Sequence, residues 1–411
     1  MGRWRGSAAC CAERCELSAQ PTIMISAGEA SGDLHAAHAV EALRASGIEP
    51  KLLGMGGPQL EALGMRLVLD ARELAVVGIV EVLVQYRSIM KKLEKLRDAL
   101  RREKPDLLIC VDYPDFNLKL CETARECGVP VLFYVSPQVW AWRPKRVERI
   151  GRLVDAMAVL FPFEVDFYRR AGVPVRYVGN PLLDQVDMHP DRAALRAEFG
   201  LGERPAVALL PGSRRGEIAR ILPLVLDSAR RLVDALGAVD FLLPMATTLP
   251  RELIEELVAE QPGGAPAGLQ LLDGRAHDAV AASDAVLCAS GTATLEVGLI
   301  GTPLAIVYRV NPITYAIMRR LMTIDDIGLV NIVAGRRIAR EFVQRDARPQ
   351  AIADELQRLL QDRDYAEAMR AAMAGLREKM GEGGGARRVA ALIAEMLDDL
   401  PGTLARLRAG E

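Results

Sequence analysis

A glycine-containing turn near the start of the chain carries the first residues that could do chemistry. The stretch Ser26–Ala37 reads S-A-G-E-A-S-G-D-L-H-A-A and follows the apolar residues Ile23–Ile25. Its two glycines are four apart and no lysine follows, so the spacing fits neither a P-loop nor a dinucleotide-binding fingerprint. The turn also holds two carboxylates, Glu29 and Asp33, which would repel a phosphate. The segment therefore predicts a strand-to-helix turn that looks like a phosphate-binding turn but whose two acids are unsuited to that ligand.

A candidate general base follows a second apolar segment. Residues Leu107–Val111 run into D-Y-P-D-F-N, which begins at Asp112. A carboxylate at the end of a strand, beside a cleft, is well placed to take a proton from a substrate. Asp112 is nearer to the strand than Asp115 and is the predicted base. The alternative is that either aspartate caps the next helix, and we expect one to cap and the other to act in catalysis.

Two further turns have the small residues that let a nucleotide approach the backbone. After Ala206–Leu210 comes P-G-S-R-R-G-E, where a helix N-terminus could hold a diphosphate with help from Arg214 or Arg215. After Cys288 comes A-S-G-T-A-T-L-E, in which Glu296 could hold a ribose diol. The alternatives are a solvated turn with a serine cap for the first, and tight helix–sheet packing with an exposed Glu296 for the second.

Two apolar segments have less specific patterns. Residues Val135–Arg143 contain two of the three tryptophans and predict either a wall for a sugar or lipid, or core packing between domains. Residues Leu74–Val84 are apolar, and Arg87–Lys104 after them hold eight basic and three acidic side chains. This order is typical of a surface that lies on anionic membrane, although periodicity alone favours a core element followed by a solvated helix.

Short apolar runs alternate with helical patterns along most of the chain, which predicts α/β layers with parallel sheets. The expected strands are Ile23–Ala27, Lys51–Leu53, Leu107–Asp112, Val131–Val135, Ala156–Leu160, Val175–Val178, Ala206–Leu210, Phe241–Leu243, Leu269–Leu271, Ala285–Cys288 and Leu304–Val307. Eleven strands exceed one ordinary open sheet, so two domains are expected, with a boundary near Pro181–Pro190. The polar clusters follow these strands, where ligands bind in open α/β sheets.

Composition limits the class of protein. The chain has 411 residues, half of them apolar, and a formal net charge of −2, so its charge gives no case for nucleic-acid binding. No apolar run reaches the length of a membrane span. Seven cysteines show no metal-ligand spacing, and those after residue 20 suggest buried thiols of a reducing cytosol. Residues 1–20 lack a signal-peptide pattern and suggest a disordered extension or a start codon placed too early.

Taken together, these stretches resemble the lipid-A-disaccharide synthases, bacterial glycosyltransferases with the GT-B fold of two Rossmann-like domains. The motifs that carry the resemblance are S-A-G-E-A-S-G-D, L-A-V-V-G-I-V-E-V-L, D-Y-P-D-F-N, Y-V-S-P-Q-V-W-A-W-R, F-P-F-E, L-P-G-S-R-R-G-E, A-S-G-T-A-T-L-E and N-I-V-A-G-R. It covers roughly Pro21 to Met396. It implies an inverting transfer from UDP-2,3-diacylglucosamine to the 6-hydroxyl of 2,3-diacylglucosamine 1-phosphate, giving a β-1,6 disaccharide and UDP, without a metal or cofactor.

The resemblance also implies residue roles. Asp112 matches the base, and Glu29 matches an acid needed for activity. The donor would be bound by Gly212, Ser213, Arg214, Ser290, Gly291, Thr292, Ala293, Thr294, Glu296 and Asn331. The acceptor side would involve Ser26, Gly28, Ser31, Asp33, Asp115 and Trp142. The chain departs from the family at Leu329-Val330-Asn331, where relatives often have proline before the asparagine, and at His35–Ala37, where relatives place a small, glycine-containing segment.

Further expectations concern organisation and location. Residues 1–20 lie outside the resemblance and are expected to be an extension. The resemblance implies an acceptor domain over 21–183, a UDP-sugar domain over 184–365, and helices over 366–411 that return to the first domain. Because both substrates carry acyl chains, a membrane patch is expected, formed by Val76, Val77, Ile79, Val80, Val82 and Leu83. The enzyme would then be cytoplasmic, bound to the inner face of the inner membrane, and compatible with a homodimer.

Three alternatives stay open at this level. Another GT-B enzyme that uses a UDP-sugar, such as an N-acetylglucosaminyltransferase or an epimerase, would share the nucleotide turns but not the apolar-basic segment. A non-catalytic nucleotide-sugar-binding protein would have no need of the carboxylates Asp112 and Glu29. A dinucleotide oxidoreductase is disfavoured because its glycine fingerprint is missing.

Overall fold

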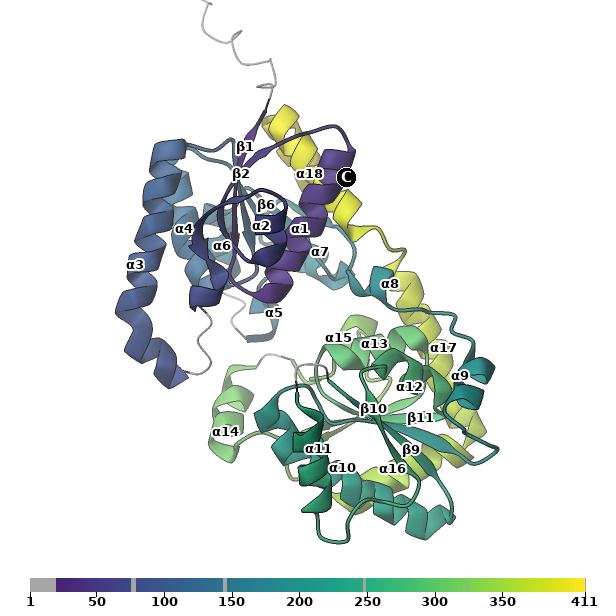
Figure 1. Ribbon diagram of the computed structural model, residues 1–411. Coiled ribbons are helices and arrows are strands. Elements are labelled where there is room, and N and C mark those ends of the chain that lie inside the picture. The colour runs from purple at the N-terminus through teal and green to yellow at the C-terminus, as the bar shows by residue number, and fades with distance from the viewer. Residues whose placement is uncertain (1–19, 75–78, 143–145, 247–248, 323, 411) are drawn as a thin grey trace, which may run out of the picture. The chain divides into compact units, whose positions relative to one another are not determined.

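The structure is a computed structural model that describes residues 20–74, 79–142, 146–246, 249–322 and 324–410 (Figure 1). Within these ranges, residues 74, 79–86, 142, 313–314 and 317–318 are described for their backbone only. The described chain divides into two compact units. The first contains residues 20–140, those from 146 to Pro181, and residues 384–410, and the second contains Leu182–Gly383 with the described residues Ala141 and Trp142.

The first unit is built around a seven-stranded parallel sheet with the order β3-β2-β1-β4-β5-β6-β7. Its strands are β1 (Thr22–Ala27), β2 (Lys51–Gly56), β3 (Arg66–Asp70), β4 (Leu107–Val111), β5 (Val131–Tyr134), β6 (Ala156–Val159) and β7 (Val175–Tyr177). Alternate side chains of β1 enter different cores: Met24 packs on one face of the sheet, and Ile23 and Ile25 pack on the other. The strand order changes direction between β1 and β4, which is where ligands bind in such sheets.

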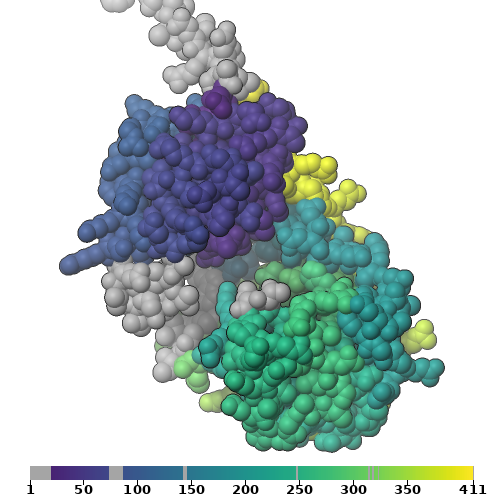
Figure 2. All heavy atoms as spheres, in the orientation of Figure 1, coloured from purple at the N-terminus to yellow at the C-terminus, as the bar shows by residue number. Residues whose placement is uncertain are grey.

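Helices cover both faces of this sheet. They are α1 (Ala30–Ala45), α2 (Pro58–Ala62), the 3₁₀ turn η1 (Ala71–Leu74), α3 (Ile79–Glu103), α4 (Pro114–Cys127), α5 (Val139–Trp142), α6 (Val147–Leu153), α7 (Pro162–Arg170), α18 (Gly385–Asp398) and α19 (Leu400–Ala409). Helix α18 lies along α1, with Val389, Leu392 and Ile393 in the same core as β1. In Figure 2 this late segment, in yellow, lies against the purple residues of the same unit.

The second unit contains a six-stranded parallel sheet with the order β10-β9-β8-β11-β12-β13. Its strands are β8 (Ala206–Leu210), β9 (Asp240–Met245), β10 (Leu269–Asp273), β11 (Ala285–Ala289), β12 (Leu304–Tyr308) and β13 (Arg340–Val343). Its helices are α8 (Leu182–Gln185), α9 (Arg192–Glu198), α10 (Arg215–Leu236), α11 (Arg251–Ala259), α12 (Ala276–Ala282), α13 (Thr292–Ile300), α14 (Pro312–Leu321), α15 (Leu329–Ala334), α16 (Pro349–Gln361) and α17 (Arg363–Met380). The order changes direction between β8 and β11.

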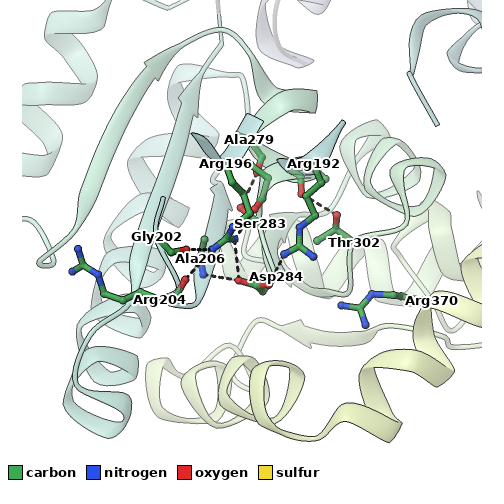
Figure 3. A network of polar contacts seen from close by, with 12 residues as sticks. Arg192, Arg196, Gly202, Arg204, Ala206, Ala279, Ser283, Asp284, Thr302 and Arg370 are labelled. Carbon is green, nitrogen blue, oxygen red and sulfur yellow. Dashed lines mark hydrogen bonds and ion pairs between the residues drawn. The ribbon is translucent and has the colours of Figure 1, made fainter. Parts of the chain in front are cut away.

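A polar network fastens α9 to the amino ends of the second sheet (Figure 3). Asp284, directly before β11, accepts hydrogen bonds from Ala206 N at 2.9 Å and Arg196 Nη1 at 3.3 Å, and forms an ion pair with Arg192. Arg196 also donates to the carbonyls of Gly202 and Arg204 at 2.7 and 3.1 Å. These contacts fix α9 at the amino ends of β8 and β11, whereas the polar turns lie at the carboxyl ends of the strands.

The helices after residue 365 divide between the two units. Helix α17 packs on α13, α15 and α16 of the second unit, which extends to Gly383, and only α18 and α19 belong to the first. The return expected from residue 366 therefore begins later, because α17 carries its own buried stripe, which includes Met369, Met373 and Leu376. Among the described residues, no helix has both the length and the apolarity needed to cross a bilayer.

Candidate functional site

A pocket of about 710 Å³ lies in the second unit at the carboxyl ends of β8, β9 and β11. The N-terminal turns of α10, α12 and α13 point into this region, so their free backbone N–H groups and dipoles favour an anion. The lining includes most of the residues expected to bind a nucleotide. It is formed by Leu210, Gly212, Ser213, Arg214, Glu217, Pro244, Met245, Ala246, Gly274, Arg275, Ala276, His277, Asp278, Val280, Ala289, Ser290, Gly291, Thr292, Ala293, Glu296 and Val297.

The first turn of the pocket depends on a glycine. Gly212 has a φ of 114°, and a Cβ there would lie 2.3 Å from a carboxylate oxygen of Glu217. That carboxylate accepts the N–H of Ser213 at 3.2 Å. The residue that caps α10 is Arg214 rather than the serine, and its side chain is exposed and makes no hydrogen bond or ion pair with the described residues. Arg214 is thus available to a ligand.

The second turn is held in shape by hydrogen bonds from its own side chains to backbone carbonyls. Ser290 Oγ donates to the carbonyl of Ile327 at 2.9 Å, and Gly291 precedes α13 in an extended conformation. Thr294 was expected to contact the donor, but it is fully buried and its hydroxyl donates to the Gly291 carbonyl at 2.9 Å. Its position in the first turn of the helix directs the side chain back onto the backbone, so it supports the turn, while the exposed Thr292 and the partly exposed Ala293 line the pocket.

Glu296 has a partner that the sequence interpretation missed. His277 Nε2, on α12, lies 3.0 Å from Glu296 Oε2, on α13. This hydrogen bond, together with the negative charges of Glu296 and Asp278, raises the pKa of His277 against the opposing effect of burial. The histidine follows the predicted strand Leu269–Leu271 within a few residues. The rule that polar residues after strands face ligands could therefore have found it.

Asn331 was also expected to lie near the donor, and the structure gives it a different task. Its side chain is fully buried and all its hydrogen-bonding capacity is used. The amide nitrogen donates to the Ala339 carbonyl and to Glu341, both at 2.8 Å, and the oxygen accepts the N–H groups of Ile338 and Ala339, both at 2.9 Å. Because no atom of the amide is left for a ligand, Asn331 braces the loop that leads into β13.

The predicted base lies at the switch point of the first sheet. Asp112 and Tyr113 have φ values of 49° and 48°, a left-handed conformation that is strained for residues with side chains. Buried Asn117 holds this backbone: its amide donates to the Asp112 carbonyl at 2.8 Å and to the Ser26 carbonyl at 3.1 Å. Burial, and then the negative charge of Glu29, raise the pKa of Asp112. Asn117 is a second residue that the sequence interpretation missed.

The glycine-containing turn, Ser26–Ala37, lies against the residue that follows this base. Gly28 packs so closely that a Cβ there would lie 2.6 Å from the Tyr113 ring. Glu29 is exposed at the N-cap position of α1, where its side chain forms no capping hydrogen bond, and Ser31 is exposed in the first turn. The structure thus brings Gly28 and Glu29 beside Asp112, with a like charge that accounts for part of the raised pKa.

Two other residues of the turn face the interior. Asp33 was expected to meet sugar hydroxyls, but it is buried and accepts the N–H groups of Gly57, Gln59 and Leu60 at 2.7, 2.9 and 3.3 Å. It therefore holds the N-terminus of α2, where a carboxylate is stabilised by the free N–H groups. Ser26 is likewise buried, and its hydroxyl donates to Asn117 at 2.6 Å. Both expected acceptor contacts are corrected to structural roles.

The remaining expected residues are more peripheral or lie outside the description. Asp115 is exposed and pairs with Arg146, and the N-cap of α4 is Tyr113, so neither aspartate caps this helix with its side chain. The side chain of Trp142 is not among those described. Val76 and Val77 lie outside the described residues, as do the side chains of Ile79, Val80, Val82 and Leu83. Among the described residues, no group of three or more histidine, cysteine or acidic side chains could hold a metal ion.

A buried acid in the F-P-F-E motif lies behind the tryptophan segment. Glu164 accepts the N–H of Phe161 at 3.0 Å and the indole N–H of Trp140 at 3.2 Å. Burial raises the pKa of Glu164 to about 7. The same cluster joins Ser136 to Tyr168 at 2.9 Å, and burial raises the pKa of that tyrosine as well. These contacts hold the segment that follows β5 against α7, so the indole of Trp140 packs within the first unit.

Comparison with known proteins identifies the relatives of this chain. A family model described as lipid-A-disaccharide synthetase matches residues 23–394. The lipid-A-disaccharide synthase of Geobacter sulfurreducens is 48% identical over 379 residues, covering 91% of this chain and 97% of the relative. The synthase of Myxococcus xanthus is 45% identical over 378 residues, covering 92% of this chain and 98% of the relative.

Solved structures share the fold at low sequence identity. MurG of Acinetobacter baumannii has a TM-score of 0.55 at 16% identity, covering 92% of this chain and all of the other. The UDP-GlcNAc 2-epimerase of Neisseria meningitidis, bound to UDP-GlcNAc, has a TM-score of 0.54 at 13% identity, covering 92% of this chain and 99% of the other. These likenesses confirm the predicted α/β fold of the GT-B type.

Proposed function

Because the chain belongs to the lipid-A-disaccharide synthetase family, we propose that it transfers 2,3-diacylglucosamine from UDP to 2,3-diacylglucosamine 1-phosphate. The family match over residues 23–394 is the observation that carries this proposal. The new bond joins the donor's anomeric carbon to the acceptor's 6-oxygen, and the bond between that carbon and the UDP oxygen breaks. UDP leaves with the bonding electrons. One displacement of this kind inverts the anomeric centre and gives a β-1,6 disaccharide 1-phosphate.

The pocket of the second unit is the proposed donor site. Its two small-residue turns let a diphosphate approach the N-termini of α10 and α13, and exposed Arg214 can meet the charge that builds up on the leaving UDP. Glu296 has a carboxylate at the pocket wall that can accept hydrogen bonds from two ribose hydroxyls. These features support a uridine diphosphate at this position.

Asp112 is the proposed base for the acceptor. Its raised pKa makes it a better proton acceptor than an ordinary carboxylate once it is ionised, and Glu29 beside it contributes to that shift. In the reaction Asp112 takes the proton of the 6-hydroxyl as the oxygen attacks. The strained backbone held by Asn117 supports this role, since strain in a rigid turn is often found where a side chain must be positioned for chemistry.

Acyl chains on both substrates place the reaction at a membrane surface in this proposal. Helix α3 begins with apolar residues and continues with exposed basic residues that include Arg87, Lys91 and Lys95. An apolar helix start beside cations suits an anionic bilayer. Replacing Val80 and Leu83 by serine should reduce the fraction of protein bound to anionic vesicles more than it reduces the fraction of protein that is folded. Unchanged vesicle binding of the double variant would refute the membrane patch.

A transferase assay in detergent micelles tests the reaction. Wild type should form the disaccharide from UDP-2,3-diacylglucosamine and 2,3-diacylglucosamine 1-phosphate. Asp112→Ala should lose about a hundredfold or more of kcat, because a general base contributes about 10²–10⁴-fold, while its UDP affinity stays unchanged. If wild type and Asp112→Ala are equally active, the proposed reaction stands, but another residue must be the base. If folded wild type binds UDP but forms no disaccharide, the proposed acceptor is wrong, and another enzyme that uses a UDP-sugar is favoured.

A further inference from the structure

The donor pocket has an unusual balance of charge. Its lining holds two arginines, Arg214 and Arg275, and three acids, Glu217, Asp278 and Glu296. With a neutral His277 these groups sum to −1, and with a protonated His277 they sum to zero. A donor diphosphate adds further negative charge. The helix N-termini already favour an anion here, and protonation of His277 would remove the net negative charge of the side chains that opposes it.

One of the two arginines, Arg275, already has acidic partners. Arg275 donates to Asp278 at 2.7 Å and forms a bidentate pair with Glu198. Two carboxylates neutralise this guanidinium, so it offers little to a ligand. Arg214 is then the remaining arginine of the lining, which also holds two carboxylates, Glu217 and Glu296, that have no arginine partner among the described residues.

His277 is directed at one of these two carboxylates. Its Nε2 lies 3.0 Å from Glu296 Oε2, and both side chains remain partly exposed, at 38% and 24%. An ionised carboxylate only accepts hydrogen bonds, so Nε2 carries the proton. The pair uses one oxygen of Glu296 and leaves the other oxygen free for the ribose hydroxyls. The contact therefore fixes the orientation of the carboxylate without blocking it.

We propose that His277 is a positioning residue for the nucleotide donor: it holds Glu296 toward the ribose and, when protonated, offsets the carboxylates beside the diphosphate. This inference rests on the proposed function, in which the pocket binds UDP. The groups that face the histidine are Glu296 on α13, Asp278 on its own helix and Arg275 before that helix, with Glu217 on α10 across the pocket. Glu217 and Glu296 also influence a common neighbour, Cys288 near the end of β11. Burial, and then the negative charges of both acids, raise the pKa of its thiol.

The sign of the pH dependence follows from the contact. The hydrogen bond to Glu296 raises the pKa of His277 above its ordinary value, so the cation is present in mildly acidic solution. As pH rises through that pKa the proton is lost, and the contribution of the charge to donor affinity is lost with it. If the contact only joined α12 to α13, its loss would change the stability of the second unit but not the pH dependence of donor binding.

The test measures UDP binding to the full chain by titration calorimetry between about pH 5.5 and 8.5, a range that brackets histidine titration. UDP also titrates in this range, so the informative quantity is the ratio of dissociation constants between a variant and wild type at each pH. For His277→Gln the ratio should be about five- to tenfold at the acid end, the size expected for the typical net contribution of one hydrogen bond, and should shrink as pH rises. His277→Lys keeps a cation and should bind UDP nearly as wild type does at acid pH, without weakening as the pH rises.

Two controls separate positioning from a general effect of substitution. His189 is exposed in the same unit and is not part of the lining, so His189→Gln should bind UDP as wild type does at every pH. In a Glu296→Gln background, His277→Gln should cost less than it does in wild type, because the contact that positions Glu296 is already gone. In the transferase assay, His277→Gln should raise KM for the donor and leave kcat within about twofold, as expected for lost ground-state binding.

The outcomes are distinguishable from a failure of the proposed function. A ratio near one at all pH values for His277→Gln, in a wild type that binds UDP, would overturn this inference and leave the donor pocket standing. An equal loss in the Glu296→Gln background would overturn it as well. No UDP binding by folded wild type would refute the pocket itself, and with it the inference.

Discussion

Replacing Gly28 by alanine should damage catalysis far more than folding. The new Cβ would lie 2.6 Å from Cδ1 and 2.7 Å from Cγ of Tyr113. Carbon atoms in contact lie about 3.5 Å apart or more, so the ring must retreat by about 0.9 Å. Tyr113 is the neighbour of Asp112 in a strained, left-handed pair, and the displacement therefore reaches the base.

The expected magnitude follows from that displacement. A misplacement of about 1 Å costs about a hundredfold in rate, whereas overpacking costs about 1–3 kcal/mol of stability, which a folded domain can bear. Gly32→Ala is the matched control, since the nearest atoms to its Cβ are at 3.5 and 3.6 Å. It lies inside α1 and should stabilise the protein by about 0.5–1 kcal/mol. The assay compares kcat, UDP affinity and denaturant unfolding. Wild-type kcat in Gly28→Ala, or an equal loss in Gly32→Ala, would refute the reasoning.

Three further predictions concern titration and bracing. The pH profile of kcat/KM should fall on the acid side through the raised pKa of Asp112, and Glu29→Gln should move that limb to lower pH because it removes the like charge. The fold favours protonated Glu164, because burial raises its pKa from the ordinary value of 4.5 to about 7. As pH rises from about 4.5 to about 7, the free energy of unfolding of wild type should therefore fall by about 3 kcal/mol. Denaturation of Glu164→Gln at the same pH values should not show this loss. Asn331→Ala should lose about 2–4 kcal/mol in denaturant unfolding, since it orphans buried partners; unchanged stability would contradict its bracing role.

The strands that the sequence predicted are short segments rich in apolar residues, a few of which contain a polar residue, such as Arg176 in Val175–Val178. All eleven expected segments form strands in the structure, with ends that differ by a few residues. Two strands were missed, β3 (Arg66–Asp70) and β13 (Arg340–Val343). Both lie at the edge of their sheet, where one side has no neighbouring strand and charged residues are tolerated. The other two edge strands, β7 and β10, were predicted, so edge position alone does not separate the strands that were found from those that were missed; β3 and β13 have apolar runs of only three and two residues, L-V-L and F-V, after a charged start.

For the site, the sequence predicted where polar residues gather but not which way they point. The same motif holds exposed Glu29 and buried Asp33, because the direction of each depends on a contact partner far along the chain, such as Gly57 for Asp33. Asn117 and His277 escaped attention for a related reason. Their partners, Ser26 and Glu296, lie 91 and 19 residues away, and only the folded sheet brings each pair together.

The late return of α18 to the first unit has a consequence for synthesis on the ribosome. Val389, Leu392 and Ile393 complete a core that also contains Ile23 and Ile25, yet the whole second unit, Leu182–Gly383, is translated between them. At about 5–20 residues per second, those roughly 200 residues take some 10–40 s. During that time the second unit can fold from a continuous segment, while the first has an uncovered apolar face. Nascent chains paused before residue 384 should therefore recruit chaperones to the N-terminal sheet, and release of α18 from the ribosome should end that binding.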